Sequence, residues 1–146
     1  MQRKIISAAI TLASLVLSGC ATTYQNMDTG LTGGYRNFSV NNQLEKVVFS
    51  GNGFIHYQAV INFAKYRSAE FAKENNKPYF LMYESLLDAS LNRTSSSPEY
   101  GIVGNKPISI CYIKLLDEYQ QGALETDVIL EKFEKKVKQG NSNETL

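Results

Sequence analysis

The sequence predicts an α+β domain, a two-layer sandwich in which two helices cover a small mixed sheet of three strands. The expected order along the chain is β-α-β-β-α. Two segments place apolar residues at helical spacing, and three segments are rich in β-branched and aromatic residues. About 20 residues separate the first two strands, a length that suits a parallel right-handed crossover. The third strand is then expected to run antiparallel.

The first half of this domain, which we place at residues 37–139, contains one strand and one helix. Residues 43–50 (QLEKVVFS) are the expected first strand, and the Gly-Asn-Gly segment at 51–53 is a strong turn signal that ends it. Residues 55–75 are predicted to be helical because their apolar residues recur at helical spacing. Pro78 ends this helix, since a proline disfavours helical geometry in the residue before it.

The second half supplies two more strands and the closing helix. Residues 79–83 (YFLMY) are apolar on both faces, which is typical of a central strand covered on each side. Residues 86–106 contain a serine run, a proline and two glycines, so we expect a long, mobile loop. Residues 107–116 are the third strand. Residues 124–138 form the second helix, with acidic residues near its start and lysines near its end, and a disordered tail is expected at 140–146.

The first 19 residues are predicted to be a signal peptide rather than part of the fold. Arg3 and Lys4 give a positive start, and residues 5–17 form an apolar run that is too short to span a membrane. The run ends in Leu17-Ser18-Gly19-Cys20, which resembles the lipobox of bacterial lipoproteins. The resemblance implies cleavage before Cys20, with an S-diacylglycerol group and an N-palmitoyl group on that cysteine.

Lipidation at Cys20 implies a stable membrane anchor, because each buried methylene contributes about 0.8 kcal/mol. Ala21 follows the cysteine, where the sorting rule of enteric bacteria uses aspartate for retention in the inner membrane. We therefore expect the outer membrane, with the domain facing the periplasm. Residues 20–36 are rich in Thr, Gly and Asn, and we expect them to be the lipidated cysteine and a flexible tether.

The charge balance argues against nucleic acid as a partner. The chain has 15 basic and 14 acidic residues, and loss of Arg3 and Lys4 with the signal peptide changes the formal charge from +1 to −1. Such a balance gives no electrostatic footprint for nucleic acid or for an anionic membrane surface.

Gly51, Asn52 and Gly53 are the first candidate site, because exposed N–H groups in a glycine-rich turn before a helix can bind anions. The segment lacks the lysine of a P-loop and the spacing of a dinucleotide motif. The favoured interpretation is a tight turn that needs positive φ. His56, the single histidine, has no zinc-ligand spacing around it and is expected to be exposed.

Arg67 and Glu70 are the second candidate, three residues apart on the predicted helix and directed toward the sheet or its rim. Such a pair can form a ligand or catalytic site, but a structural ion pair is the favoured interpretation. Cys111 has no intramolecular partner once Cys20 is lipidated, which leaves burial or intermolecular pairing. Its place in an apolar strand favours burial.

Three motifs within residues 33–84, roughly half of the chain after Cys20, resemble a pattern in small proteobacterial lipoproteins of unknown function. They are Gly33-Gly34-Tyr35, Phe49-Ser50-Gly51-Asn52-Gly53-Phe54 and Phe63-x-x-x-Arg67-x-Ala69-Glu70. The family has tyrosine at the place of Phe63 and a glycine-aromatic turn at the place of residues 75–78. The resemblance implies membrane localisation and a fold, but the family has no assigned activity.

Two functional hypotheses follow. The leading one is a non-catalytic binding module of the bacterial envelope, anchored through Cys20, whose partner is another envelope protein or peptidoglycan. It requires no cofactor, metal or catalytic residue. The alternative is a small-ligand or hydrolytic site around Arg67, Glu70 and His56, which requires a polar pocket lined by all three.

Overall fold

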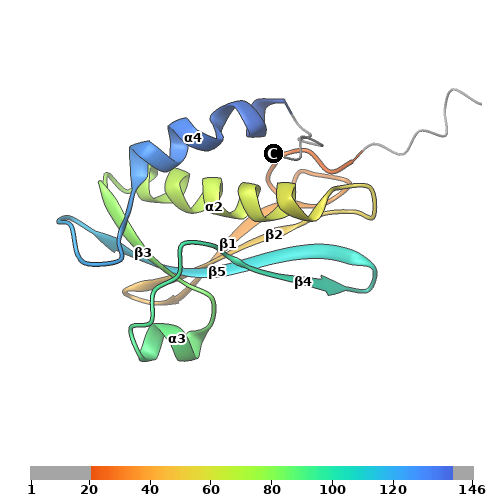
Figure 1. Cartoon of the computed structure of the whole chain (residues 1–146). Coiled ribbons are helices and arrows are strands. Elements are labelled where there is room, and N and C mark those ends of the chain that lie inside the picture. The colour runs from red at the N-terminus through yellow and green to blue at the C-terminus, as the bar shows by residue number, and fades with distance from the viewer. Residues whose placement is uncertain (1–20, 140–146) are drawn as a thin grey trace, which may run out of the picture.

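The computed structural model describes residues 21–139, and these form an α+β fold in which two long helices lie over one face of an antiparallel sheet (Figure 1). Its six strands are β1 (Gly34–Asn41), β2 (Leu44–Ser50), β3 (Tyr79–Tyr83), β4 (Glu99–Val103), β5 (Lys106–Leu116) and β6 (Leu124–Glu125). Its helices are α2 (Tyr57–Glu74), α3 (Leu86–Ser90) and α4 (Thr126–Lys138). The predicted signal peptide, the lipidated Cys20 and the predicted tail at 140–146 lie outside the described residues.

The longest strand, β5, organises the sheet. β2 pairs with one edge of β5, while β4 and β3 share its other edge, giving the strand order β1-β2-β5-β3-β6 with β4 beside β5. Both β2 and β3 run antiparallel to β5, so they run parallel to each other with β5 between them. The chain therefore crosses over through α2, but the expected mixed sheet of three strands is wrong. The strand that separates β2 from β3 comes from later in the chain, which a local pattern cannot indicate.

Five expected elements are confirmed to within two residues at each end, namely the strands β2, β3 and β5 and the helices α2 and α4. The mobile loop expected at residues 86–106 is wrong, because α3 and β4 form there. The side chain of Ser85 caps α3 by accepting a hydrogen bond of 3.1 Å from Asp88 N. Gly104 and Asn105, at φ 55° and 63°, form a two-residue turn that joins β4 to β5.

The main core lies between the sheet and the two long helices. Alternate residues of the strands point toward α2, including Val47 and Phe49 of β2 and Cys111 of β5, all of them 0 % exposed. Phe63 of α2 packs its ring against that of Phe49 with centroids 4.9 Å apart. The opposite face is covered in part by α3, which lies below the sheet in Figure 1.

The expectation of a flexible tether at residues 20–36 is wrong for the part from residue 21 onward. Thr22 is 0 % exposed, and β1 begins at Gly34. The ring of Tyr24 contacts Phe63 edge-on at 5.6 Å and lies parallel to Phe49 at 6.4 Å. Burial of this ring and of Thr22 outweighs the flexible composition of the segment. None of the described helices has the length and hydropathy needed to cross a membrane.

Candidate functional site

The Gly-Asn-Gly turn between β2 and α2 is occupied by the chain's own N-terminal segment. Asn52 Oδ1 accepts hydrogen bonds from Thr22 N at 3.3 Å and from Phe54 N at 3.1 Å. Asn52 N in turn donates to Thr22 Oγ1 at 2.8 Å, and Gly51 N donates to Pro107 O at 2.8 Å. These backbone donors are therefore engaged within the fold, which favours a structural role over anion binding.

The positive φ expected for the Gly-Asn-Gly turn is wrong, because neither glycine adopts it. Gly51 is required for a steric reason. A Cβ at this position would lie 2.2 Å from Cγ2 of Ile55, which is itself buried against the core. Gly53 has open space around it, with Asn105 O as the nearest atom at 4.0 Å. The turn therefore brings α2 close to the sheet at Gly51 and approaches the β4–β5 turn at Gly53.

Arg67 forms the centre of a polar cluster on the inner side of α2. Its Nε donates to Asn37 Oδ1 of β1 at 3.0 Å. Its Nη1 donates to Glu70 Oε2 at 3.2 Å, and both terminal nitrogens bind Glu74 at 2.6 and 3.0 Å. The Arg67 side chain is only 11 % exposed. All three guanidinium nitrogens are thus engaged by protein groups, and we call these residues, together with Tyr24, the Arg67 cluster.

Aromatic rings enclose the guanidinium and the Glu70 carboxylate. Arg67 Cζ lies 4.6 Å from the ring centroid of Tyr35, and the Tyr24 hydroxyl donates a hydrogen bond to Glu70 Oε2. Burial, followed by the hydrogen bond and charge of Glu70, raises the pKa of Tyr24 well above its ordinary value. Burial alone would lower the pKa of Arg67, but the hydrogen bonds and charge of Glu74 raise it. Both groups therefore keep their protons across the physiological range.

His56 does not share a site with Arg67 and Glu70. It is exposed, as expected, and its Nδ1 caps α2 by accepting a hydrogen bond of 3.3 Å from Gln58 N. Eleven residues of helix separate it from Arg67, a rise of about 16 Å. The polar pocket lined by all three residues, which the alternative hypothesis requires, is therefore not formed.

Cys111 is buried, as expected from its position in an apolar strand. It is 0 % exposed, and its Sγ lies 3.3 Å from Ser68 Oγ on α2. Burial raises the pKa of the Cys111 thiol to about 12, although the hydrogen bond with Ser68 lowers it in part. A thiol in this setting is neither an accessible nucleophile nor available for an intermolecular disulfide.

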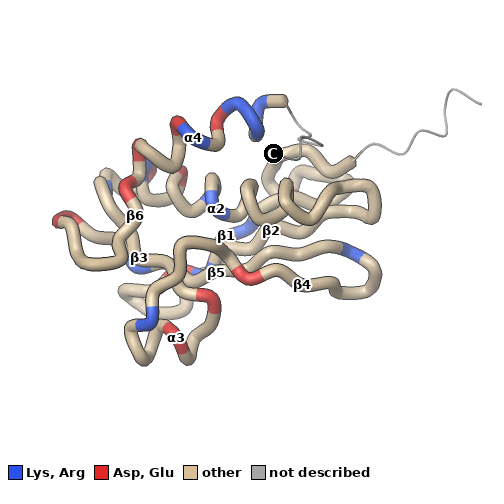
Figure 2. Tube along the Cα trace, viewed as in Figure 1, with Lys and Arg blue, Asp and Glu red and all other residues tan. Residues whose placement is uncertain are grey.

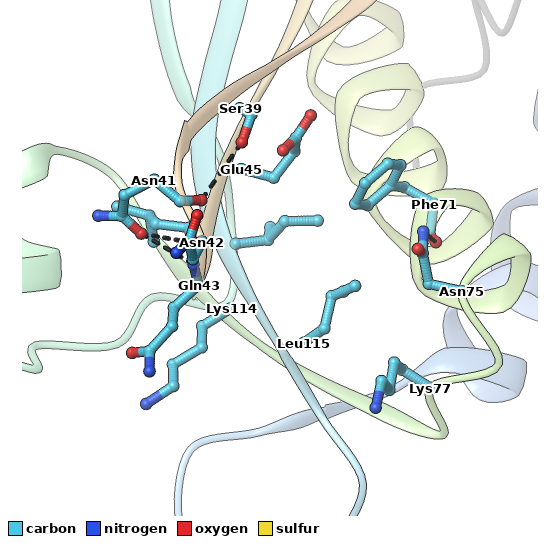
Figure 3. Close-up of a pocket in the computed structure, with 12 residues that line it drawn as sticks. Ser39, Asn41, Asn42, Gln43, Glu45, Phe71, Asn75, Lys77, Lys114 and Leu115 are labelled. Atoms are coloured by element: carbon cyan, nitrogen blue, oxygen red, sulfur yellow. Dashed lines mark hydrogen bonds between the residues drawn. The ribbon is translucent and has the colours of Figure 1, made fainter.

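Two clefts flank the tip of the β1–β2 hairpin, at the end of the sheet away from the Gly-Asn-Gly turn. The helix-side cleft encloses about 440 Å³ between the hairpin and the end of α2. Figure 3 shows Glu45 and Leu115 on the sheet facing Phe71 on α2 across this space. Burial raises the pKa of Glu45, and the charge of Arg67 opposes that rise.

Several polar side chains of the helix-side cleft are bound to other parts of the chain. Asn41 Oδ1 accepts from Gln43 N at 2.9 Å and from Leu44 N at 3.0 Å, and Asn75 Nδ2 donates to Phe71 O at 2.8 Å. Lys77 Nζ forms an ion pair of 2.7 Å with Asp117. These contacts shape the hairpin tip and the helix end, and Glu45, Asn42, Lys114 and several apolar side chains also line the cleft.

The α3-side cleft lies on the other face of the hairpin tip and encloses about 460 Å³. Its apolar part is formed by Val40, Leu44, Tyr83, Leu86 and Ala89, and its polar part includes Asn41, Gln43, Asn92, Lys114 and Gln120. Leu86 is 49 % exposed, and Leu87 and Leu91 of the same segment are 62 % and 56 % exposed. The cleft therefore combines an apolar floor with a rim of amide side chains and one lysine.

The sequence interpretation missed both clefts, although one signal was available. Three leucines within residues 86–91 are unusual in a solvent-exposed mobile loop, and they indicated a buried or binding segment. Within residues 21–139 no group of three or more His, Cys, Asp or Glu side chains is placed to hold a metal ion. Comparisons of the chain with family models, with curated proteins and with solved structures find no match.

Proposed function

We propose that the protein is a lipoprotein of the bacterial envelope that binds another envelope protein through the α3-side cleft. In this proposal the chain is cleaved before Cys20, lipidated on that cysteine and held on the outer membrane facing the periplasm. The sequence support is the positive start, the apolar run and the lipobox-like Leu17-Ser18-Gly19-Cys20. The observation that supports binding is the α3-side cleft with the exposed leucines beside it.

A protein partner fits this cleft better than a small molecule. Val40, Leu86, Leu87 and Leu91 are between 40 % and 62 % exposed, so apolar surface extends beyond the hollow itself. Water contact with such a surface is unfavourable, and extended apolar patches on soluble domains mark interaction sites. The amide groups at the rim supply hydrogen bonds for a partner's main chain.

A binding role also agrees with how the reactive side chains are used. Arg67 and Glu70 join α2 to β1 and to the N-terminal segment, His56 caps α2, and Cys111 is enclosed in the core. Each of these groups has a structural task that the chain itself supplies. The alternative of a hydrolytic site around Arg67, Glu70 and His56 has no geometric support, because His56 lies at the far end of the helix.

The first experiment tests the proposed cleavage, lipidation and membrane localisation. Cys20→Ser removes the thiol that accepts the diacylglyceryl group, and we expect uncleaved, non-lipidated precursor in the inner membrane. Intact mass and membrane fractionation measure this outcome, with wild-type protein as the control. Mature protein released from the Cys20→Ser chain would contradict the proposed processing.

The second experiment tests the cleft. A photo-crosslinking amino acid replaces Leu86 in the full chain, and the matched control replaces Val128, which is 51 % exposed on α4. We expect a discrete protein adduct from position 86 and none from position 128. Val40→Asp, across the cleft, should remove the adduct, whereas Val128→Asp should leave it.

Two results would overturn the protein-binding proposal. Equal adducts from positions 86 and 128 would show that the cleft is not a specific surface. A ladder of adducts of many sizes that lysozyme digestion reduces to one small product would identify peptidoglycan as the partner instead.

A further inference from the structure

The chain enters the fold at one end of the sheet with almost no slack. Thr22 is fully buried, bonded to Asn52 in the β2–α2 turn and, through its Oγ1, to Thr32 O at 2.8 Å. Only Ala21 lies between Thr22 and Cys20, and two Cα-to-Cα steps of extended chain span at most about 7 Å. A lipid group on Cys20 would therefore bring this end of the fold directly against the bilayer surface.

Three segments far apart in the sequence meet at this end. They are the N-terminal segment, the β2–α2 turn and the β4–β5 turn, which Figure 1 shows at the same end of the molecule. Asn52 of the β2–α2 turn bonds Thr22, and Gly51 N donates to Pro107 O beside the β4–β5 turn at 2.8 Å. We call this the proximal end. Lys114, which lines the α3-side cleft, lies eight residues along β5 from Lys106 at this end, a separation of about 26 Å.

Large apolar side chains at the proximal end point into solvent. Leu31 is 103 % exposed, Phe54 is 67 % exposed, and Ile102 and Val103 are each 66 % exposed. Tyr57, 50 % exposed, places its ring 5.8 Å from that of Tyr100. Single exposed apolar residues are ordinary, but these residues come from each of the three segments that meet here. Aromatic rings with a polar tip are also the side chains that favour a membrane–water interface.

The charge distribution at the proximal end suits a phospholipid surface. Residues 50–58 and 100–108 contain no Asp or Glu, and Lys106 follows the β4–β5 turn. Figure 2 shows both turns free of acidic colour, with basic colour beside the β4–β5 turn. Asp28 of the N-terminal segment is paired with Arg36. Carboxylates are costly to desolvate and repelled by lipid phosphates, whereas a lysine can extend its ammonium toward them.

We infer that the proximal end docks onto the lipid bilayer, with Leu31, Phe54, Ile102 and Val103 at the boundary between headgroups and acyl chains. This inference rests on the proposed lipidation of Cys20 and goes beyond it, because it assigns a lipid-binding surface to the folded domain. The anchor and the surface act together: the anchor supplies proximity, and apolar contact holds one orientation. The α3-side cleft is then directed away from the membrane, toward the periplasm.

The test uses tryptophan fluorescence, since the chain contains no tryptophan. The lipidated protein is purified from bacterial membranes and reconstituted into phosphatidylethanolamine–phosphatidylglycerol vesicles with brominated acyl chains, which quench nearby tryptophan. Phe54→Trp reports on the proximal end. Tyr119→Trp is the matched control, because Tyr119 is 65 % exposed, is also aromatic and lies beyond the far end of β5.

We expect blue-shifted emission and severalfold stronger quenching for Phe54→Trp than for Tyr119→Trp. Adding Ile102→Asp and Val103→Asp to Phe54→Trp should remove most of that quenching, because the carboxylates prevent insertion. Equal quenching at positions 54 and 119 would overturn the inference. So would quenching that the two aspartates leave unchanged, because proximity without apolar contact would then explain it.

Intact mass of the same sample separates this inference from the proposed function. A lipid on Cys20 with an unquenched tryptophan at position 54 would refute docking and leave the lipoprotein proposal standing. Absence of lipid would refute both. Blue-shifted emission without quenching would indicate a protein surface, such as a second copy of the chain, in place of lipid.

Discussion

The Arg67 cluster and the α3-side cleft both gather polar side chains from distant segments, but they differ in what those side chains bind. In the cluster, the guanidinium of Arg67 is 11 % exposed and its nitrogens are engaged by Asn37, Glu70 and Glu74. In the cleft, amide side chains rim a hollow of about 460 Å³. The cluster is closed by the chain itself, whereas the cleft is open to solvent and is the surface that we propose for a partner.

This difference shows why charge alone is a poor guide to function. Arg67 and Glu70 are the pair that the sequence offers as a possible site, yet their partners place them in the joint between α2, β1 and the N-terminal segment. A buried ion pair of this kind fixes an arrangement rather than reacting with a ligand. The cleft contains no unusual motif, and its apolar exposure is what marks it.

The largest expected effect comes from removing the aromatic part of the closed cluster. Tyr24→Ala deletes a ring that packs on Tyr35, Phe49 and Phe63, and it should lower the free energy of unfolding by about 3–5 kcal/mol. Thermal or urea unfolding measures this change. Tyr119→Ala, at an exposed ring that contacts only Tyr79 among the aromatic rings, should cost at most about 1.5 kcal/mol. An unchanged midpoint for Tyr24→Ala would mean that the N-terminal segment is a free tether after all.

Removal of the charge at the centre of the cluster should have the next largest effect. Arg67→Ala leaves Glu70 beside apolar rings and should cost about 2–3 kcal/mol, less than for a fully enclosed pair because Glu74 is 54 % exposed. Arg93→Ala is the control, since that arginine is 60 % exposed in its pair with Asp88 and should cost about 0–1 kcal/mol. If Arg67→Ala and Arg93→Ala lower the free energy of unfolding by the same amount, solvent rather than the protein stabilises the Arg67 charge. That outcome would favour the interpretation of Arg67 as a ligand-binding residue.

Alkaline pH should lower the free energy of unfolding, because the thiol of Cys111 is buried in the core. Burial raises the pKa of Cys111 from its ordinary value of 9.0 to about 12. Between these values the unfolded chain loses this proton and the folded chain keeps it, so stability falls as pH rises, by about 1.4 kcal/mol per pH unit at most. Urea unfolding at pH 8 to 11 should show a smaller decline for Cys111→Ala than for wild type. Parallel declines in the two proteins would exclude burial of the thiol as a cause.

The smallest effect on stability is expected at the exposed leucines of the α3 segment, next to the residues that line the α3-side cleft. Leu87→Asn and Leu91→Asn replace side chains that are already 62 % and 56 % exposed, so each should change the unfolding free energy by less than about 0.5 kcal/mol. The same variants should reduce the adduct from position 86 at least tenfold. A large loss of stability without loss of the adduct would contradict this prediction. It would show that these leucines stabilise the fold and do not contact a partner.

Sequence patterns predicted the elements whose side chains are buried on a regular period. Helical spacing of Phe63 and its neighbours indicated α2, and the apolar runs at residues 79–83 and 107–116 indicated β3 and β5. The same reasoning predicted that Cys111 is buried. It did not predict β1 and β4, because these strands carry exposed polar and apolar residues without a clear alternation. Their place in the sheet depends on backbone hydrogen bonds to β2 and β5, which almost any side chain permits.

The sequence by itself determined the two long helices, the three inner strands and the pairing of Arg67 with Glu70, because local periodicity and helical spacing encode them. Only the tertiary structure decided that Thr22 and Tyr24 join the core and that two clefts flank the β1–β2 hairpin. Each of these features joins segments at least ten residues apart. Such contacts form when the sheet order brings the segments together, and no local pattern records that order.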